Sequence, residues 1–257
     1  MTTSWAMALA VAVFGLCVGS FLNVCIFRLP RHESIVRPRS RCTSCGRTLS
    51  WFDNLPVASW VALGGRCRTC GARVSWMYPA VEIVTAGTLV GVYLLYGLTP
   101  LGAVRALFAC ALIVLFVTDL QHKILPNVIT LPGIVVGFAC SLFLAPGWRD
   151  SLIGILAGGG VLFVIAEAYY RVRGQEGLGM GDVKLLGMIG AFLGWKLVLL
   201  TLVTASFAGS LAGVALLATG RGNMKYALPF GTFLAVGALF SAVWGTPIVD
   251  WYLGFYR

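Results

Sequence analysis

The chain has 257 residues, of which 59% are hydrophobic and 11% are charged, and it carries a formal net charge of +10. Soluble domains have about 25% charged residues, so we expect this protein to use a lipid bilayer as its main solvent. The apolar runs are continuous and do not alternate with polar residues, which argues against a β-barrel. The composition therefore predicts an all-α polytopic membrane protein.

Eight apolar runs are candidate transmembrane helices, because a helix that crosses a bilayer needs about 20 mostly apolar residues. In chain order the runs are 5–27, 78–98, 101–118, 128–144, 151–170, 185–195, 197–218 and 228–251. The sixth run is short, so we expect it either to be tilted and extended by its flanks or not to cross fully. Glycines within the runs, such as Gly154, Gly158 and Gly159, predict close packing between helices.

The first run is expected to stay in the membrane as a helix. No positive charge precedes it and it is long enough to span, which does not fit a cleaved signal peptide. Nine arginines follow between Arg28 and Arg73, against only Glu33 and Asp53. Basic loops face the cytoplasm and attract anionic lipid. We therefore expect segment 28–76 to lie inside and both termini outside, and we expect no nucleic-acid partner.

By composition the chain divides into three parts. Residues 1–27 are the first transmembrane helix, residues 28–76 are a small cytoplasmic loop domain, and residues 77–257 are a transmembrane core. Segments 119–126, 171–184 and 220–225 of the core are also expected inside, because the Lys and Arg of the loops favour this orientation. No internal repeat is expected in the chain.

Four of the eight cysteines lie in the loop domain as two CxxC pairs, Cys42 with Cys45 and Cys67 with Cys70, separated by 21 residues. A glycine follows each pair, which is typical of tight turns that present thiolates. Two such turns can hold Zn²⁺ in a tetrahedron of four sulfurs. Two disulfides are the alternative, which a reducing cytoplasm disfavours. Because four thiolates leave no open coordination position, the metal would be structural and would stabilise a small domain.

Two acidic residues lie at the ends of apolar runs: Asp119 ends the third run, and Asp182 precedes the sixth. The expected topology places both at the cytoplasmic boundary, where ionisable groups are often functional. Each alone has a structural explanation, since Asp119 could mark the interface beside Lys123 and Asp182 could be a helix N-cap. Together they can share a proton, so that one activates water while the other polarises a peptide carbonyl. Gly179 and Gly181 would let a backbone approach this pair closely.

Nearly the whole chain resembles the bacterial type IV prepilin peptidases, which combine a leader peptidase with an N-methyltransferase. The matching segments are GSFLNVCIFRLP (19–30), the two CxxC pairs with WFDNLP (51–56), YPAVE (78–82), Asp119 with Leu125-Pro126, GMGD (179–182) and PFG (229–231). The chain departs from the common pattern at Asn127 and Thr232, where aspartate and proline are usual. Neither residue is expected to touch the aspartate pair.

The resemblance implies that Asp119 and Asp182 are the catalytic pair of a GxGD-type aspartic peptidase at the cytoplasmic face of the bacterial inner membrane. It implies substrates too: type IV prepilins and the pseudopilins of type II secretion, cut after a glycine that ends a short basic leader. It further implies methylation of the new N-terminal residue by S-adenosylmethionine. Gly64, Gly65 and Arg66 are the candidate donor-binding residues, together with the turn at 53–54.

Two questions stay open at this point. Glu82, at the expected cytoplasmic start of the second run, could pair with an arginine of the loop domain or assist the site, and the pairing is the simpler explanation. The function has two alternatives: a peptidase whose loop domain is only structural, and an ion-coupled transporter whose aspartates bind protons or cations.

Overall fold

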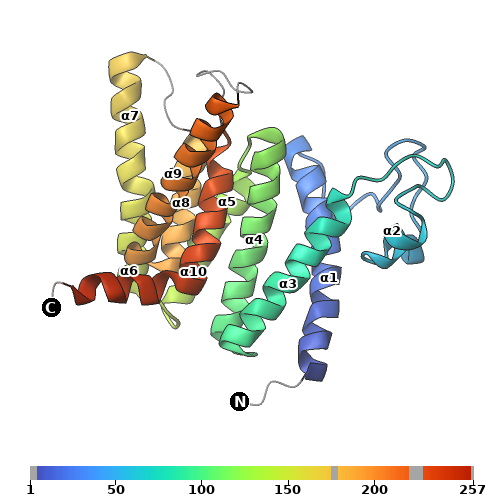
Figure 1. Cartoon of the computed structure of the whole chain (residues 1–257), viewed down its shortest axis with the longest axis horizontal. Helices are drawn as coiled ribbons and strands as arrows, with labels where there is room; N and C mark the ends of the chain where they lie inside the picture. Colours follow the sequence, from blue (N-terminus) through green and yellow to red (C-terminus); the bar gives the residue numbers. More distant parts are fainter. Residues whose placement is uncertain (1–4, 175–178, 220–227, 256–257) are drawn as a thin grey trace. The chain divides into compact units, whose positions relative to one another are not determined.

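The computed structural model describes residues 5–174, 179–219 and 228–255. Most of these residues are helical with short connections, but segment 29–76 is largely irregular around the short helix α2 (Figure 1). The helices are α1 (Trp5–Arg28), α2 (Ala58–Ala62), α3 (Met77–Tyr96), α4 (Pro100–His122), α5 (Asn127–Ser141), α6 (Trp148–Ile155), α7 (Val161–Arg173), α8 (Met180–Leu193), α9 (Trp195–Ala218) and α10 (Phe230–Gly254). A π-helical turn, η3 (Leu156–Gly160), joins α6 to α7, and 3₁₀ turns lie at Leu29–Arg31 (η1) and Trp51–Asn54 (η2). The all-α prediction is confirmed.

Every predicted apolar run coincides with a helix, but among the described residues six helical segments are long and apolar enough to cross a membrane. These are α1, α3, α4, the continuous segment α6–η3–α7, α9 and α10. The other two runs form α5, with 15 residues, and α8, with 14 residues, which fall short of the roughly 20 residues of a full span. The number of eight crossings therefore stays a prediction. The predicted basic segment 220–225 lies outside the described residues.

The chain forms two compact units that divide inside α4, between Val114 and Leu115. The three-part division by composition stays a prediction, since it describes polarity rather than compactness. In the first unit α1 packs closely against α3. A Cβ on Gly15 would lie 2.6 Å from the Cα of Ala86, so only glycine allows this approach.

In the second unit α8 is the central helix, surrounded by α5, α6, η3, α9 and α10 (Figure 1). Its residues from Leu185 to Leu193 are all buried. The glycines of the neighbouring segment make the approach possible, because a Cβ on Gly190 of α8 would lie 2.1 Å from the carbonyl oxygen of Gly154. Gly158 and Gly159 also lie against the backbone of α8, where a Cβ would be 2.7 Å and 3.3 Å from the nearest backbone atom. The predicted close packing through glycines is therefore confirmed at Gly154, Gly158 and Gly159.

The outer face of α9 carries large apolar side chains that stay exposed: Val203, Phe207, Leu211 and Val214. Their spacing of three and four residues places them on one side of the helix. An exposed apolar stripe of this length is expected where a helix faces lipid tails rather than water. The buried face of the same helix, at Val198, Thr201 and Ala205, packs inside the second unit.

Candidate active site and metal centre

Asp119 lies in the last turns of α4, where its side chain is buried with a relative exposure of 5%. Its Oδ2 accepts two hydrogen bonds from Thr232 in the first turn of α10, from the backbone N–H at 2.6 Å and from Oγ1 at 2.9 Å. The first N–H groups of a helix have no partner within the helix, and the N-cap residue Pro229 makes no side-chain cap. Asp119 therefore caps α10 from another helix. The expectation that Thr232 does not touch the aspartate pair was wrong.

Asp182 lies in the first turn of α8, ahead of the apolar run that begins at Leu185, and its side chain is half-buried. The N-cap of α8 is Gly179, so the interpretation of Asp182 as an N-cap was wrong. Burial and, after it, the charge of the Asp119 carboxylate raise the pKa of Asp182 to about 7. Two carboxylates that interact in this way tend to hold one proton between them near neutral pH.

Three glycines allow the close packing around the two aspartates. A Cβ on Gly231 would lie 3.0 Å from Oδ2 of Asp119 and 2.9 Å from Cδ1 of Leu125. A Cβ on Gly181 would lie 3.1 Å from Cβ of the same leucine, and one on Gly179 would lie 3.1 Å from Oδ2 of Asp182. Leu125 thus packs against the starts of both α8 and α10. The sequence motifs contained Leu125 and Gly231, but nothing in their spacing indicated this contact.

A hydrogen bond between side chains also connects the start of α8 with the start of α5. Nζ of Lys184 donates a hydrogen bond to Oδ1 of Asn127 at 2.9 Å. The side chain of Asn127 therefore serves as an acceptor between two helices. The α8 turn that carries Asp182 is therefore held by a polar contact as well as by packing.

The four cysteines of the loop domain come together as predicted: the sulfurs of Cys42, Cys45, Cys67 and Cys70 all lie within 4.8 Å of one another. None is paired in a disulfide. Four sulfurs around Zn²⁺, each at about 2.3 Å, form a tetrahedron with edges of about 3.8 Å. The distance from Cys42 Sγ to Cys70 Sγ is 3.8 Å, so the thiols fit a zinc ion with little rearrangement.

The two cysteine turns are copies of one another, which corrects the expectation that the chain has no internal repeat. Segment 40–51 reads SRCTSCGRTLSW and segment 65–76 reads GRCRTCGARVSW. The backbone hydrogen bonds are also equivalent: Cys42 N–H bonds to Arg47 and Gly46 N–H to Cys42 in the first turn, and the same pattern recurs 25 positions later.

Each turn also prepares its first cysteine to be a thiolate. Hydrogen bonds from the backbone of Cys45 and Ser44 lower the pKa of Cys42 to about 6. The equivalent bonds from Cys70 and Thr69 lower the pKa of Cys67. Because the thiolate is the form that binds metals, the local backbone of each turn favours metal ligation.

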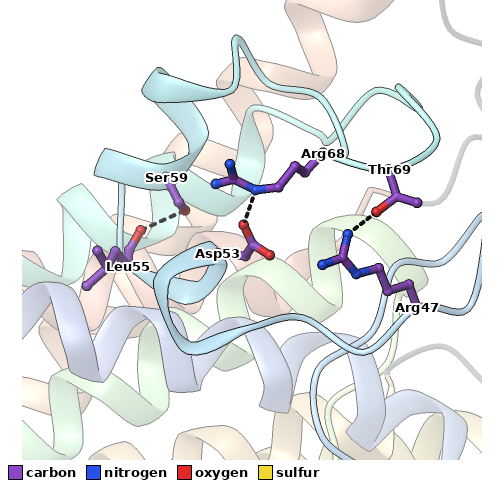
Figure 2. Close-up of polar contacts among 6 residues, drawn as sticks. All are labelled: Arg47, Asp53, Leu55, Ser59, Arg68 and Thr69. Atoms are coloured by element: carbon purple, nitrogen blue, oxygen red, sulfur yellow. Dashed lines mark hydrogen bonds and ion pairs between the residues drawn. The ribbon is translucent and has the colours of Figure 1, made fainter.

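Side-chain contacts connect the two turns with the segment between them (Figure 2). Arg47 of the first turn donates to Oγ1 of Thr69 in the second. Nε of Arg68 forms an ion pair with Asp53 at 2.9 Å. The hydroxyl of Ser59 donates to the carbonyl oxygen of Leu55 at 2.8 Å at the start of α2. The loop domain is therefore one connected structure rather than an open linker.

A cavity of about 760 Å³ in the first unit is lined by α1, α3 and the loop domain. Arg66 and the turn at 53–54 line it. Gly64 and Gly65 have positive φ angles of 58° and 66° and form the turn that leads from α2 to Arg66. A Cβ on Gly65 would lie 2.9 Å from the ring of Trp60, so the structure gives this glycine a packing role.

Glu82 of α3 also lines the cavity, and its side chain is buried. Its Oε2 accepts the backbone N–H of Val57 at 2.8 Å, so Glu82 holds the loop domain through the backbone and not through an arginine as expected. Val57 has a φ of 59° at the centre of a γ-turn before α2. Such a conformation is strained for a β-branched residue, and the hydrogen bond to Glu82 helps to maintain it.

Comparison with known families covers most of the chain. Residues 13–96 match the model of the bacterial peptidase A24 N-terminal domain, and residues 106–214 match that of the type IV leader peptidase family. No solved structure gave a significant match.

Three curated proteins named prepilin leader peptidase/N-methyltransferase are among the similar sequences. The protein of Myxococcus xanthus is 44% identical over 85% of this chain and 66% of its own length. The protein of Burkholderia pseudomallei is 36% identical over 96% of this chain and 88% of its own length. The protein of Pseudomonas aeruginosa is 32% identical over 97% of this chain and 94% of its own length. The chain belongs to the type IV leader peptidase family.

Proposed function

We propose that this protein removes the leader of type IV prepilins and pseudopilins with Asp119 and Asp182, and then methylates the new N-terminus. The observation that carries the proposal is the interaction between a buried Asp119 and an Asp182 whose pKa is raised to about 7. The names of the relatives agree with both activities. Family membership also favours the peptidase over the ion-coupled transporter.

The two aspartates would divide the chemistry between them. Asp182, which its pKa of about 7 leaves partly protonated at neutral pH, would in its protonated form donate a hydrogen bond to the carbonyl oxygen of the scissile peptide. Asp119, whose ionised form two donors from Thr232 favour, would take a proton from a water molecule. The water oxygen would then attack the carbonyl carbon, the C–N bond would break, and the leaving nitrogen would gain a proton. The products are a leader carboxylate and a free pilin amine.

Substitution of each aspartate by asparagine tests this mechanism, because asparagine keeps the shape of the side chain and cannot exchange the proton. We expect Asp119→Asn and Asp182→Asn each to lower the cleavage rate of a purified prepilin in detergent by about 10²- to 10⁴-fold. Normal cleavage by either variant, in protein that unfolds at the wild-type temperature, would contradict the two-aspartate mechanism. The mass of the processed pilin shows in the same assay whether a methyl group has been added. Leader loss alone would select the peptidase without methyl transfer.

We also propose that the Cys₄ cluster holds a structural zinc ion and that the methyl donor binds in the cavity of the first unit. S-adenosylmethionine carries a carboxylate, an ammonium and a sulfonium group, and it would supply the methyl group when bound. The cavity combines Arg66 with the carboxylates of Asp53 and Glu82, which suit these charges. Its volume of about 760 Å³ is in the range of small-molecule sites. Gly64 and Gly65 would shape the turn that presents Arg66.

Donor binding can be measured apart from catalysis by titration calorimetry on the full-length protein in detergent. We expect Arg66→Ala to weaken S-adenosylmethionine binding by about tenfold, because it removes a charged hydrogen-bond donor. Arg39→Ala is the matched control, since Arg39 is exposed in the same loop domain and does not line the cavity. Equal affinities of the two variants, at unchanged zinc content, would exclude Arg66 as a donor-binding residue.

The location proposed for these activities is the bacterial cytoplasmic membrane, with the active site at its cytoplasmic face. Six long apolar helices support the membrane location. The nine arginines between Arg28 and Arg73 support a cytoplasmic loop domain. A prepilin would meet the enzyme with its basic leader in the cytoplasm and its apolar helix in the bilayer.

A further inference from the structure

The contact between Asp119 and Thr232 joins residues that are 113 positions apart in the sequence. Both groups are buried, with a relative exposure of 5% for Asp119 and 8% for Thr232. The backbone N–H and the hydroxyl of Thr232 both donate to the same oxygen, Oδ2, at 2.6 Å and 2.9 Å. A carboxylate held at one oxygen by two donors has a fixed orientation.

A helix cap alone would need only the backbone N–H, which every residue except proline offers in the first turn of a helix. The hydroxyl is a second donor that depends on the side chain of Thr232. Gly231, one residue earlier, leaves room for this arrangement, since a Cβ there would lie 3.0 Å from Oδ2 of Asp119. Side chain, backbone and the preceding glycine therefore all act on the same carboxylate.

We infer that Thr232 is a positioning residue for peptide cleavage, which holds Asp119 by Oδ2 and directs Oδ1 toward the attacking water. This inference rests on the proposed catalytic role of Asp119. Hydrogen bonds to an ionised acceptor are stronger than those to a neutral one, so Thr232 favours the form of Asp119 that can accept a proton. Burial of Asp119 works against its charged form, and the positive charge of Lys123 works in its favour. Thr232 differs from these two effects because its hydrogen bonds also fix the orientation of the Asp119 carboxylate.

The test compares Thr232→Val, which keeps the size and the backbone N–H but removes the hydroxyl, with Thr232→Ser, which keeps both donors. We expect Thr232→Val to lower kcat for prepilin cleavage by about tenfold with KM within twofold of wild type, because one charged hydrogen bond is lost. Thr232→Ser should retain kcat within about twofold. Thr201→Val is the matched control, since Thr201 is a buried threonine of α9 whose hydroxyl bonds to Leu197 at 2.7 Å.

A normal kcat in Thr232→Val, an equal loss in Thr232→Ser, or a rise in KM without loss of kcat would overturn the inference. An equal loss in Thr201→Val would also overturn it, because the effect would then belong to any buried threonine. Asp119→Asn, assayed in parallel, distinguishes a failure of the proposed function from a failure of the role of Thr232. If Asp119→Asn still cleaves, the proposed function fails; if it is inactive while Thr232→Val is normal, only the role of Thr232 fails.

Discussion

Asp119 of α4 depends on a small and a polar neighbour that belong to another helix, α10. Thr232 provides two hydrogen bonds, and Gly231 leaves the space in which the carboxylate lies. Leu125 packs against Gly231 and Gly181, so a single leucine contacts the first turns of both α8 and α10. Adding a single methyl group at one of these glycines is therefore expected to displace the carboxylate.

Gly231→Ala tests this sensitivity. Its Cβ would lie 3.0 Å from Oδ2 of Asp119 and 2.9 Å from Cδ1 of Leu125, and both would have to move. A displacement of about 1 Å can cost about 10²-fold in rate, so we expect cleavage to fall by roughly 10- to 100-fold with little change in donor affinity. Gly91→Ala is the control, because a Cβ at Gly91 of α3 meets nothing within 4 Å. Equal activity of the two variants would show that the site tolerates the methyl group.

The two cysteine turns show how a short element can bring four thiols together in an arrangement that fits a metal ion. In each turn a glycine with a φ near 70°, Gly46 or Gly71, completes the backbone bonds that bring the cysteines together. The copies then meet so that Cys42 and Cys70 are 3.8 Å apart. A domain of this size has a small core, and binding free energy from a structural metal adds directly to its stability.

Cys42→Ser should therefore remove most of the zinc from the purified protein, because a serine hydroxyl is a poor ligand in a thiolate site. We expect the loop domain to become sensitive to protease, and methyl transfer to fall more than peptide cleavage, since both aspartates belong to the second unit. Metal content, limited proteolysis and the mass of the processed pilin measure these effects. Cys17→Ser is the control, because Cys17 is an exposed thiol of α1. Stoichiometric zinc in Cys42→Ser would refute the Cys₄ site.

At the scale of the whole molecule, the residues with proposed roles fall into the two compact units. The cysteine turns and the cavity with Arg66 and Glu82 belong to the first unit. The aspartates and Thr232 belong to the second. Matched variants in each unit can for this reason separate cleavage from methyl transfer.

Much of this organisation could be predicted from the sequence. Long apolar runs become helices because every backbone polar group must be satisfied within lipid, and each predicted run is helical. The CxxC spacing predicted the sulfur cluster because each pair is a local turn. The repeat of 40–51 at 65–76 was also present in the sequence, although it became apparent only from the equivalent hydrogen bonds.

The sequence by itself therefore determined the helices and the cysteine cluster, and its motifs indicated Asp119 and Asp182, since these features depend on local pattern and residue chemistry. Only the tertiary structure decided that Thr232 holds Asp119, that Leu125 packs on Gly231, and that Glu82 bonds to the backbone of Val57. Those contacts join helices or loops that are distant along the chain. They depend on the positions at which helices approach one another, and hydrophobic periodicity does not specify these positions.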